Sequence, residues 1–283
     1  MKNIKYFLIA LLVFALAFSF ASCKKTPEYP VQINENLVIE IAPNKVGSLS
    51  SVTNAAIKLM GYDDRLATED FGSPLKINLE NIMASNISVL FTPVNLSENT
   101  NNQLKNAGIT VVNLPTPENY EQLKEYYKII ATIMGGNVTG KEVALNINKA
   151  MDESFENIAI FLENKQKFSY VFLYEENIAA NNTSFVNNML EKCGGENKVA
   201  EENQIDSNKL TELNPDLLIV NKGLKEKLVN NEALKELNAI KNNKILEIDV
   251  NTFNLMGEGF MNVLYDILQT QYPDFLSSPE SKE

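Results

Sequence analysis

The stretch INLENIMASNISVLF (residues 77–91) returns later in the chain as IDSNKLTELNPDLLI (residues 205–219). Each copy begins with a polar turn, continues as an amphipathic helix and, after an Asn and a short break, ends in an apolar strand. The copies align without a gap, so that Ile77 matches Ile205 and Asn86 matches Asn214. A chain that encodes the same helix–strand unit twice is expected to build two similar lobes.

Short apolar runs alternate with amphipathic stretches along the rest of the chain. The apolar runs predict strands at 37–41, 45–49, 88–92, 109–113, 169–173, 216–220 and 244–249. The amphipathic stretches predict helices at 51–60, 79–85, 98–107, 117–134, 184–193, 207–213, 232–238 and 257–270. Strands that alternate with helices indicate parallel sheets covered on both faces, so the predicted fold class is α/β.

One longer helix is expected between the two repeats, after Gly135-Gly136 and over residues 139–164. Its apolar residues recur at steps of three and four, at Ala144, Ile147, Met151, Phe155, Ile158 and Leu162. At 1.5 Å per residue it would be roughly 39 Å long. The preceding helix has a suitable N-cap in Thr116. We therefore predict two Rossmann-like lobes with parallel sheets, joined by one long backbone helix.

The N-terminus has the pattern of an export signal. Lys2 and Lys5 precede an apolar run that is too short to span a bilayer, and the run ends in FASC at residues 20–23. This resembles a bacterial lipoprotein signal, in which Cys23 is lipidated and becomes the new N-terminus. A plain signal peptide followed by a chance cysteine is the alternative.

These features divide the chain into six parts. We expect a lipoprotein signal peptide at 1–22, a flexible tether at 23–36, an N-terminal lobe at 37–136, a connecting helix at 137–165, a C-terminal lobe at 166–276 and a disordered tail at 277–283.

Composition excludes several kinds of chemistry. With 25 basic and 36 acidic residues the formal charge is −11, which argues against a nucleic-acid partner. The chain has no His and only one arginine, Arg65, so His-ligated zinc or haem and Ser-His or Cys-His catalysis are excluded. The adjacent carboxylates Asp63-Asp64 and Glu175-Glu176 lack a partner nucleophile, and we expect no enzyme activity, no cofactor and no metal site.

Cys193 is the second of two cysteines, and it stands before Gly194-Gly195 at the apolar end of a helix. Because Cys23 is assigned to the lipid, no disulfide within the chain is expected. We expect Cys193 to be a buried structural thiol.

Several segments together resemble one protein family. They are SLSSVTNAAIKLMGYDDRLA (48–67), GSPLKINLENIMASNISVLF (72–91), LKNAGITVVNL (104–114), SFVNNMLEKCGGENKVA (184–200) and SNKLTELNPDLLIV (207–220). The chain resembles, over about 37–272, substrate-binding proteins of bacterial ABC importers, of the helical-backbone class that serves siderophores, haem and cobalamin. The resemblance implies a ligand cleft between the lobes and a permease in the membrane.

The resemblance also implies that one acidic residue on each lobe docks onto permease arginines. Glu80 occupies the N-lobe position, where the family has Asn-Leu-Glu at the start of a helix. The C-lobe position, before Asn-Pro-Asp, falls on Asn208 and departs from the family Glu. Glu80 would alternatively only stabilise the start of its helix.

Ligands of open parallel sheets bind at the carboxyl ends of the strands. The predicted cleft residues are therefore Ser50, Ser51, Asp70, Phe71, Thr92, Asn95 and Thr116 in the N-lobe, and Tyr174, Glu175, Asn182, Asn221, Lys222, Asn251, Phe253 and Met256 in the C-lobe. The alternative is that the Asn and Ser side chains satisfy turns and that Phe71 and Phe253 are core. Where the family often has Arg-Pro-Gly, this chain reads NLMGEG (254–259), so a neutral or cationic ligand is favoured over a carboxylate-rich one.

The sequence thus predicts an exported lipoprotein, anchored by Cys23 on the periplasmic or cell-surface side of a bacterial membrane. As a monomer it would capture a small molecule, an iron chelate or a corrinoid, and deliver it to an ABC permease. The alternative is a lipoprotein that keeps the fold but acts as a surface sensor or adhesin without transport.

Overall fold

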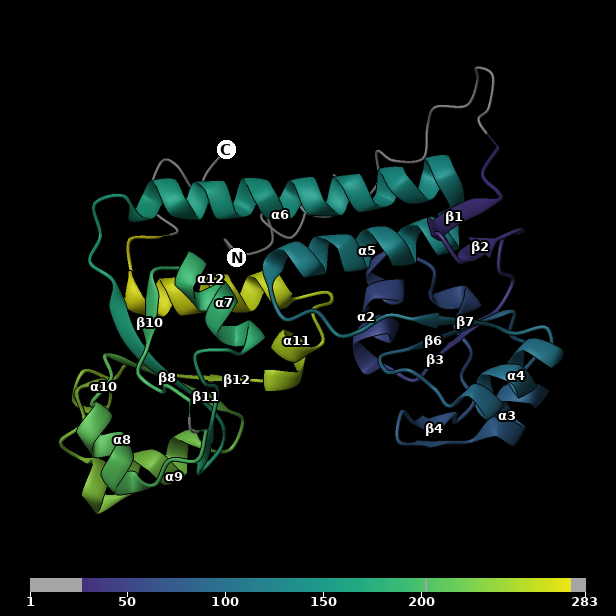
Figure 1. Cartoon of the computed structure of the whole chain (residues 1–283). Coiled ribbons are helices and arrows are strands. Elements are labelled where there is room, and N and C mark those ends of the chain that lie inside the picture. Colours follow the sequence, from purple (N-terminus) through teal and green to yellow (C-terminus); the bar gives the residue numbers. More distant parts are fainter. Residues whose placement is uncertain (1–26, 202, 276–283) are drawn as a thin grey trace.

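The computed structural model describes residues 27–201 and 203–275, which form two α/β lobes along one side of a long helix (Figure 1). The expected signal peptide at 1–22, the lipid position Cys23 and the expected tail at 277–283 lie outside the described residues. Within the described residues, no helix is both long enough and apolar enough to cross a bilayer. The predicted α/β class is confirmed.

The N-terminal lobe is built on a parallel sheet in the order β3 (Val46–Ser48), β6 (Val89–Thr92) and β7 (Thr110–Asn113). Its helices are α2 (Ser51–Leu59), α3 (Leu79–Ala84) and α4 (Glu98–Asn106). Side chains of β6 alternate between two cores, because Phe91 packs in one apolar cluster and Leu90 in another. The sheet is therefore buried on both faces, as a parallel sheet requires.

The C-terminal lobe repeats this plan with more strands. Its parallel sheet has the order β10 (Gly195–Asn197), β8 (Phe168–Glu175), β11 (Leu217–Asn221) and β12 (Ile245–Ile248), and β9 (Ile178–Ala179) pairs antiparallel with β8. Its helices are α7 (Phe185–Lys192), α8 (Ser207–Leu213), α9 (Lys225–Val229), α10 (Asn238–Lys241), α11 (Val250–Asn254) and α12 (Phe260–Gln271). Ile219 faces one core and Leu218 the other.

The repeated sequence forms the same structure twice, α3–β6 in one lobe and α8–β11 in the other. Each helix is capped by the side chain before it, Asn78 or Asp206, which accepts a backbone N–H three residues on. Each unit then turns through a left-handed Asn, with φ of 57° at Asn86 and 41° at Asn214. Asn tolerates this conformation at a helix end, so the repeated Asn reverses the chain into the strand.

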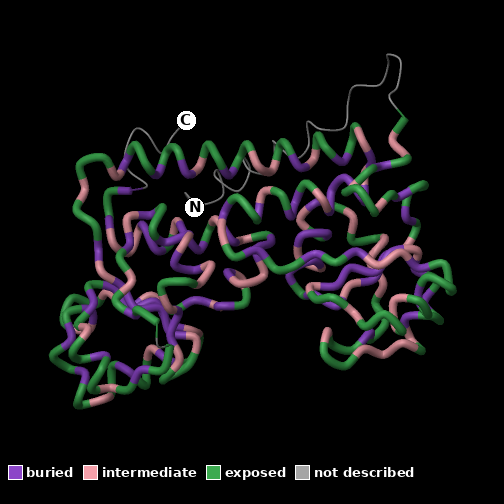
Figure 2. Tube along the Cα trace, in the orientation of Figure 1, coloured by how far each residue is buried: buried purple, intermediate pink, exposed green. Residues whose placement is uncertain are grey.

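The connecting helix is α6 (Lys141–Leu162), whose 22 residues span about 33 Å. It follows α5 (Tyr120–Gly135) through one π-helical turn, Gly136–Gly140, and packs back against α5. A Cβ at Gly140 would lie 2.1 Å from the Ala131 carbonyl oxygen, so glycine allows this close approach. Figure 2 shows buried and exposed residues alternating along α6.

The expected cap of α5 is wrong by three residues. Asn119, not Thr116, accepts the N–H of Gln122 at 3.0 Å, and α5 begins at Tyr120. Thr116 is exposed in the preceding loop. Both residue types cap helices well, so sequence preference did not separate them.

The N-terminal segment also differs from the tether expected at 23–36. Residues 31–34 form β1, which pairs antiparallel with β2 (Leu37–Ile39), and Val31 is fully buried. The Tyr29 hydroxyl donates to the Ile133 carbonyl oxygen at 2.8 Å. The described part of the expected tether is therefore packed onto α5, because its few apolar side chains complete the N-lobe core.

Several short elements escaped the sequence analysis. The helix expected at 232–238 is instead a 3₁₀ turn, Glu232–Leu234, followed by α10. Helices α9 and α11 and the hairpin of β4 (Gly72–Ser73) with β5 (Lys76–Ile77) were not expected. Each is too short to show a helical or strand period of its own.

Cys193 is a fully buried free thiol, so the predicted burial is confirmed. Burial raises the pKa of its thiol to about 12, because the apolar surroundings disfavour the thiolate. The thiol is therefore protonated at neutral pH and acts as a small apolar core residue.

Candidate functional site

The two lobes face each other through α2 and α11, which lie in the middle of the molecule (Figure 1). Both elements follow the carboxyl end of a parallel strand, α2 after β3 and α11 after β12. The topology of the two sheets thus brings their strand-end segments together between the lobes, which is where ligands of such sheets bind.

A cavity of about 320 Å³ lies between these segments. One wall comes from α2 and the other from the segment between β12 and α12. The lining residues are Ala55, Lys58, Leu59, Asp249, Asn251, Thr252, Leu255, Gly257 and Glu258. Its volume lies at the lower end of the ~300–1,000 Å³ typical of ligand pockets, and the hollow is open to solvent on one side.

The lobes touch beside this cavity. A Cβ placed on Gly257 would lie 2.9 Å from the Ala55 Cβ, so glycine lets the C-lobe approach α2 closely. On α5, the Tyr127 hydroxyl donates to the carbonyl oxygen of Met256. Burial raises the pKa of Tyr127, which keeps this donor protonated.

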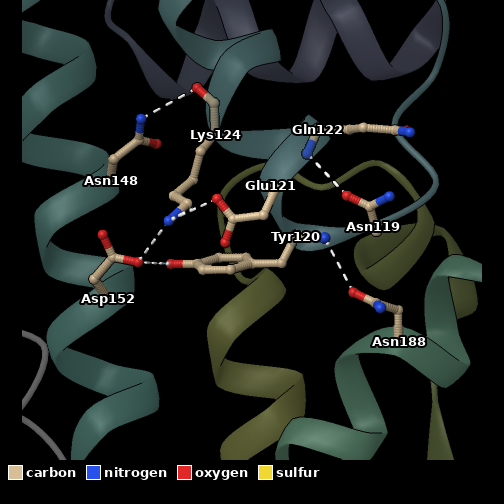
Figure 3. Close-up of polar contacts among 8 residues, drawn as sticks. All are labelled: Asn119, Tyr120, Glu121, Gln122, Lys124, Asn148, Asp152 and Asn188. Atoms are coloured by element: carbon tan, nitrogen blue, oxygen red, sulfur yellow. Dashed lines mark hydrogen bonds and ion pairs between the residues drawn. The ribbon is translucent and has the colours of Figure 1, made fainter.

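A second polar joint holds the start of α5 against both α6 and α7 (Figure 3). The backbone N–H of Tyr120 donates to Asn188 Oδ1 at 3.0 Å, and its hydroxyl donates to Asp152 Oδ1 at 2.8 Å. Lys124 Nζ also lies 3.1 Å from Asp152 Oδ1. Burial and the Asp152 carboxylate raise the pKa of Tyr120. The joint therefore ties the start of α5 to the connecting helix α6 and to α7 of the C-lobe.

Charged side chains of both signs lie at the cavity walls. Asp249 and Glu258 lie on the C-lobe wall, and Lys58 lies opposite on α2. The backbone N–H of Asn251 and the Lys222 ammonium hold the pKa of Asp249 below its usual range, so it is ionised at neutral pH. With the Lys222 ammonium beside Asp249, two carboxylates and two ammonium groups surround the cavity, so their charges balance. Because no arginine is among the lining residues, a neutral or cationic ligand is favoured over a carboxylate-rich one.

Arg65 does not contribute to this site. Its guanidinium donates to the Met134 carbonyl oxygen at 2.8 Å and lies 4.5 Å from the Tyr62 ring centre. These contacts are all within the N-lobe, so the chain's one arginine is used in its packing. Among the described residues there is no cluster of three or more side chains suited to hold a metal ion.

The predicted N-lobe cleft residues are mostly engaged in the fold. Phe71 is a core residue, 4% exposed, and Thr92, 1% exposed, donates its hydroxyl to the Val94 carbonyl oxygen. Ser50 is buried and caps α2, and Asp70 accepts the N–H of Gly72 in a turn. Exposed positions are Ser51, Asn95 and Thr116, of which Asn95 accepts a hydrogen bond from Asn113 Nδ2 at 2.5 Å.

The predicted C-lobe residues divide in the same way. Asn251 lines the cavity. Asn221 and Lys222 lie near it, since Asn221 Oδ1 accepts the N–H of Val250 at 3.4 Å and Lys222 Nζ lies 3.4 Å from Asp249.

The remaining C-lobe positions do not line the cavity. Phe253 and Met256 are instead core residues, 0% and 3% exposed, because the apolar face of α11 packs inward. Tyr174 is half-buried against Phe172, and Glu175 and Asn182 are exposed.

Sequence reasoning missed most of the cavity wall. It considered loops at strand ends and not the face of α2 that carries Ala55, Lys58 and Leu59. The sequence feature that could have indicated this wall is the set of small residues Ala55-Ala56 in α2 and Gly257, because small residues allow two elements to pack closely.

A second hollow of about 420 Å³ lies within the C-lobe alone, beside α9. Glu247 Oε1 fills part of this region and accepts the N–H groups of Gly223 and Lys225 at 2.8 and 3.3 Å. Because only one lobe lines it and its backbone donors are already satisfied, we regard the interlobe cavity as the functional site.

The two positions matched by the repeat, Glu80 and Asn208, are both exposed in the first turn of a helix, α3 and α8 respectively. The helices lie on different lobes, at the side of the molecule away from α6 (Figure 1). The two side chains are thus free to meet a partner that spans both lobes.

Comparison with known proteins agrees with this architecture. A family model described as periplasmic binding protein matches residues 70–252. No curated protein sequence matches the chain.

Three solved structures illustrate the likeness. A periplasmic binding protein from Veillonella parvula has a TM-score of 0.69 at 13% identity, over 84% of this chain and 94% of that one. The periplasmic haem-binding protein RhuT from Roseiflexus, in apo form, has 0.67 at 16%, over 82% and 99%. The vitamin B12 binding protein BtuF of Vibrio cholerae has 0.66 at 12%, over 85% and 99%. These TM-scores show a shared fold, and the family match over most of the chain shows that it belongs to the periplasmic binding protein family.

Proposed function

We propose that this protein is the substrate-binding component of an ABC importer, anchored to a bacterial membrane through a lipid on Cys23. It captures a small molecule between α2 and α11 and delivers it to a membrane permease. The observation that carries the proposal is the cavity walled by both lobes in a chain of the periplasmic binding protein family.

Iron chelates and corrinoids are the leading ligand classes. Support comes from solved relatives described as binding haem, vitamin B12 and, in Staphylococcus epidermidis, possibly iron. Because no arginine is among the lining residues, members of these classes that are neutral or positively charged are favoured. A corrinoid is larger than a cavity of about 320 Å³, so its entry requires the lobes to part beside Gly257.

Delivery would use the exposed first turns of α3 and α8. Glu80 offers one carboxylate to a permease arginine. Asn208 has no carboxylate to offer. The nearby carboxylate of Asp206 already caps α8, where its Oδ1 accepts the N–H of Lys209 at 2.7 Å. Docking would therefore rest mainly on the N-lobe.

The absence of a carboxylate at Asn208 favours a second candidate function. A lipoprotein that keeps the fold and senses or adheres at the surface needs no symmetrical grip by a permease. It would bind no chelate or corrinoid, or would bind one without passing it on.

We expect neutral or cationic ligands to stabilise the purified protein. The panel is cobalamin, haem, a cationic ferric hydroxamate and anionic ferric citrate, measured by thermal unfolding. A bound ligand at a hundredfold excess over Kd should raise Tm by roughly 5–10 °C, because it binds only the folded state. Ferric citrate should give no shift, and a panel without any shift would favour the second function.

Glu258→Gln tests whether the cavity charge sets this preference. The change keeps the side-chain shape but removes one carboxylate from the wall, so a cationic ligand should give a smaller shift in Tm. Glu98→Gln is the matched control, because Glu98 is an exposed acid on α4 that does not line the cavity. If the ligand raises the Tm of both variants equally, the ligand does not bind beside Glu258 in the interlobe cavity.

A further inference from the structure

The first described residues form a strap, Glu28–Asn34, across the turn between α5 and α6. The Glu28 carboxylate accepts the N–H of Val138 at 2.8 Å and the hydroxyl of Thr139 at 2.7 Å, and its backbone oxygen accepts the N–H of Asn137 at 2.9 Å. Asn137 Nδ2 in turn donates to the Pro30 carbonyl oxygen at 2.7 Å. The strap is thus fixed to this turn by charged and backbone hydrogen bonds.

The turn is shaped to receive the strap. Gly136 has φ of +88°, which favours glycine, and a Cβ there would lie 2.6–2.8 Å from atoms of Glu28. On the other side of the strap, Val31 is fully buried in the N-lobe core. The strap is therefore part of the N-lobe rather than a passing contact.

This places a limit on the lipid anchor, and the inference rests on the anchor assigned to Cys23 in the proposed function. Cys23 precedes Glu28 by five residues. Even fully extended, that length of chain spans at most ~18 Å, about half the length of α6. The bilayer that holds the lipid must then lie close to the α5–α6 turn.

Exposed apolar side chains gather on the elements at this end. We call Val38, Ile41, Val138 and Leu145 the apolar rim; they are 37%, 75%, 44% and 64% exposed. Val38 lies on β2, which pairs with the strap, and Ile41 follows β2. Val138 is in the turn itself, and Leu145 lies in the second turn of α6. Single exposed apolar residues need no explanation, but a set beside a lipid attachment point fits a bilayer surface.

We propose that the α5–α6 turn and its apolar rim rest on the bilayer into which the Cys23 lipid inserts. The strap, through Glu28, fixes this orientation. Figure 1 shows α3 and α8 at the side of the molecule opposite α6. The α5–α6 turn lies at the N-lobe end of α6 (Figure 1), so the N-lobe lies nearer this bilayer than the C-lobe does.

The test uses single-tryptophan variants, because the natural chain has no Trp. Full-length lipidated protein is placed in vesicles of phosphatidylethanolamine and phosphatidylglycerol with brominated acyl chains, which quench a nearby indole. Val138→Trp should show a blue-shifted emission that is largely lost on bromination. Leu75→Trp is the control, since Leu75 is 96% exposed in the β4–β5 turn of the same lobe and should keep its emission.

Other outcomes separate the orientation from the anchor. Co-flotation with the vesicles measures insertion of the lipid, so a protein that does not float would overturn the assignment of a lipid anchor to Cys23. Protein that floats but shows no quenching at position 138, or equal quenching at 75, overturns the orientation alone. A blue shift at 138 that grows with protein concentration before vesicles are added would also overturn it, because a second copy would then cover the rim.

Adding Glu28→Ala to the Val138→Trp variant tests the role of the strap. It should reduce the quenching while flotation persists, and unchanged quenching would contradict that role.

Discussion

Replacing Cys23 with Ala is expected to move the protein from the membrane fraction to the soluble fraction. A diacylated N-terminus supplies two acyl chains to the bilayer, whereas one chain gives only marginal, reversible binding. Within the described residues no helix is long and apolar enough to cross a bilayer in place of the lipid. The acidic chain, with a formal charge of −11, would also be repelled by anionic lipids.

Fractionation of cells that express wild type or Cys23→Ala provides the measurement. The variant should retain the wild-type Tm after solubilisation, because Cys23 lies outside the packed strap that begins at Glu28. Cys193→Ala is the matched control, as the second cysteine is buried and should leave the membrane association unchanged. A Cys23→Ala protein that still sediments with membranes would remove the lipoprotein assignment.

Glu80→Ala is expected to abolish permease binding while leaving ligand affinity unchanged. Glu80 is exposed in the first turn of α3, and it does not line the interlobe cavity. If it supplies the main docking carboxylate, its loss leaves a permease arginine without its partner, which slows association and weakens the complex. A pull-down with detergent-solubilised permease measures this directly.

Glu98→Ala distinguishes docking from helix stabilisation. Glu98 lies in the first turn of α4, as Glu80 does in α3, so both variants should lose a similar ~0.3–1 kcal/mol of helix stabilisation. Only Glu80→Ala should lose permease binding. Equal behaviour of the two variants would leave Glu80 with the helix-capping role alone.

Asn208→Glu is expected to strengthen the same complex. The change places a carboxylate in the first turn of α8, which has no acidic residue there. Permease binding should improve by roughly 1 kcal/mol if the new pair is partly desolvated. Asn208→Gln keeps the length without the charge and should have no effect. If Asn208→Glu leaves the affinity for the permease unchanged, the non-transport function is favoured.

The strands and the repeat could be predicted because local pattern and tertiary burial agree. In β6 and β11 every residue from Val89 to Thr92 and from Leu217 to Val220 is buried, and such continuous apolar runs are typical of parallel strands. The repeated Asn at 86 and 214 marks the same left-handed turn in both lobes. Each signal needs only a short window of sequence.

The strap could not be predicted in this way. Its key contact joins Glu28 to Val138 and Thr139, more than a hundred residues away. The segment lacks a helical or strand period, contains Pro30 and follows Pro27, a pattern that is typical of a linker. Its order depends on the shape of the α5–α6 turn, which no local pattern reveals.

The cavity wall was only partly predictable for a related reason. Asn251 follows a strand and was expected, whereas Lys58 and Leu59 lie well along a helix whose cavity-facing side is set by the approach of the other lobe. That approach depends on Gly257 beside Ala55, a contact between lobes. Strand-end rules locate the edge of a sheet but not how two sheets meet.

Amide hydrogen exchange, with and without the ligand that most raises Tm, tests the central claim most directly. If the ligand lies between the lobes, exchange should slow in peptides that cover residues 55–59 and 249–258 together, because both walls become shielded on binding. Peptides around Gly223 and Val229, beside the second hollow, should not change. Protection confined to that hollow, or to one lobe, would contradict an interlobe binding site.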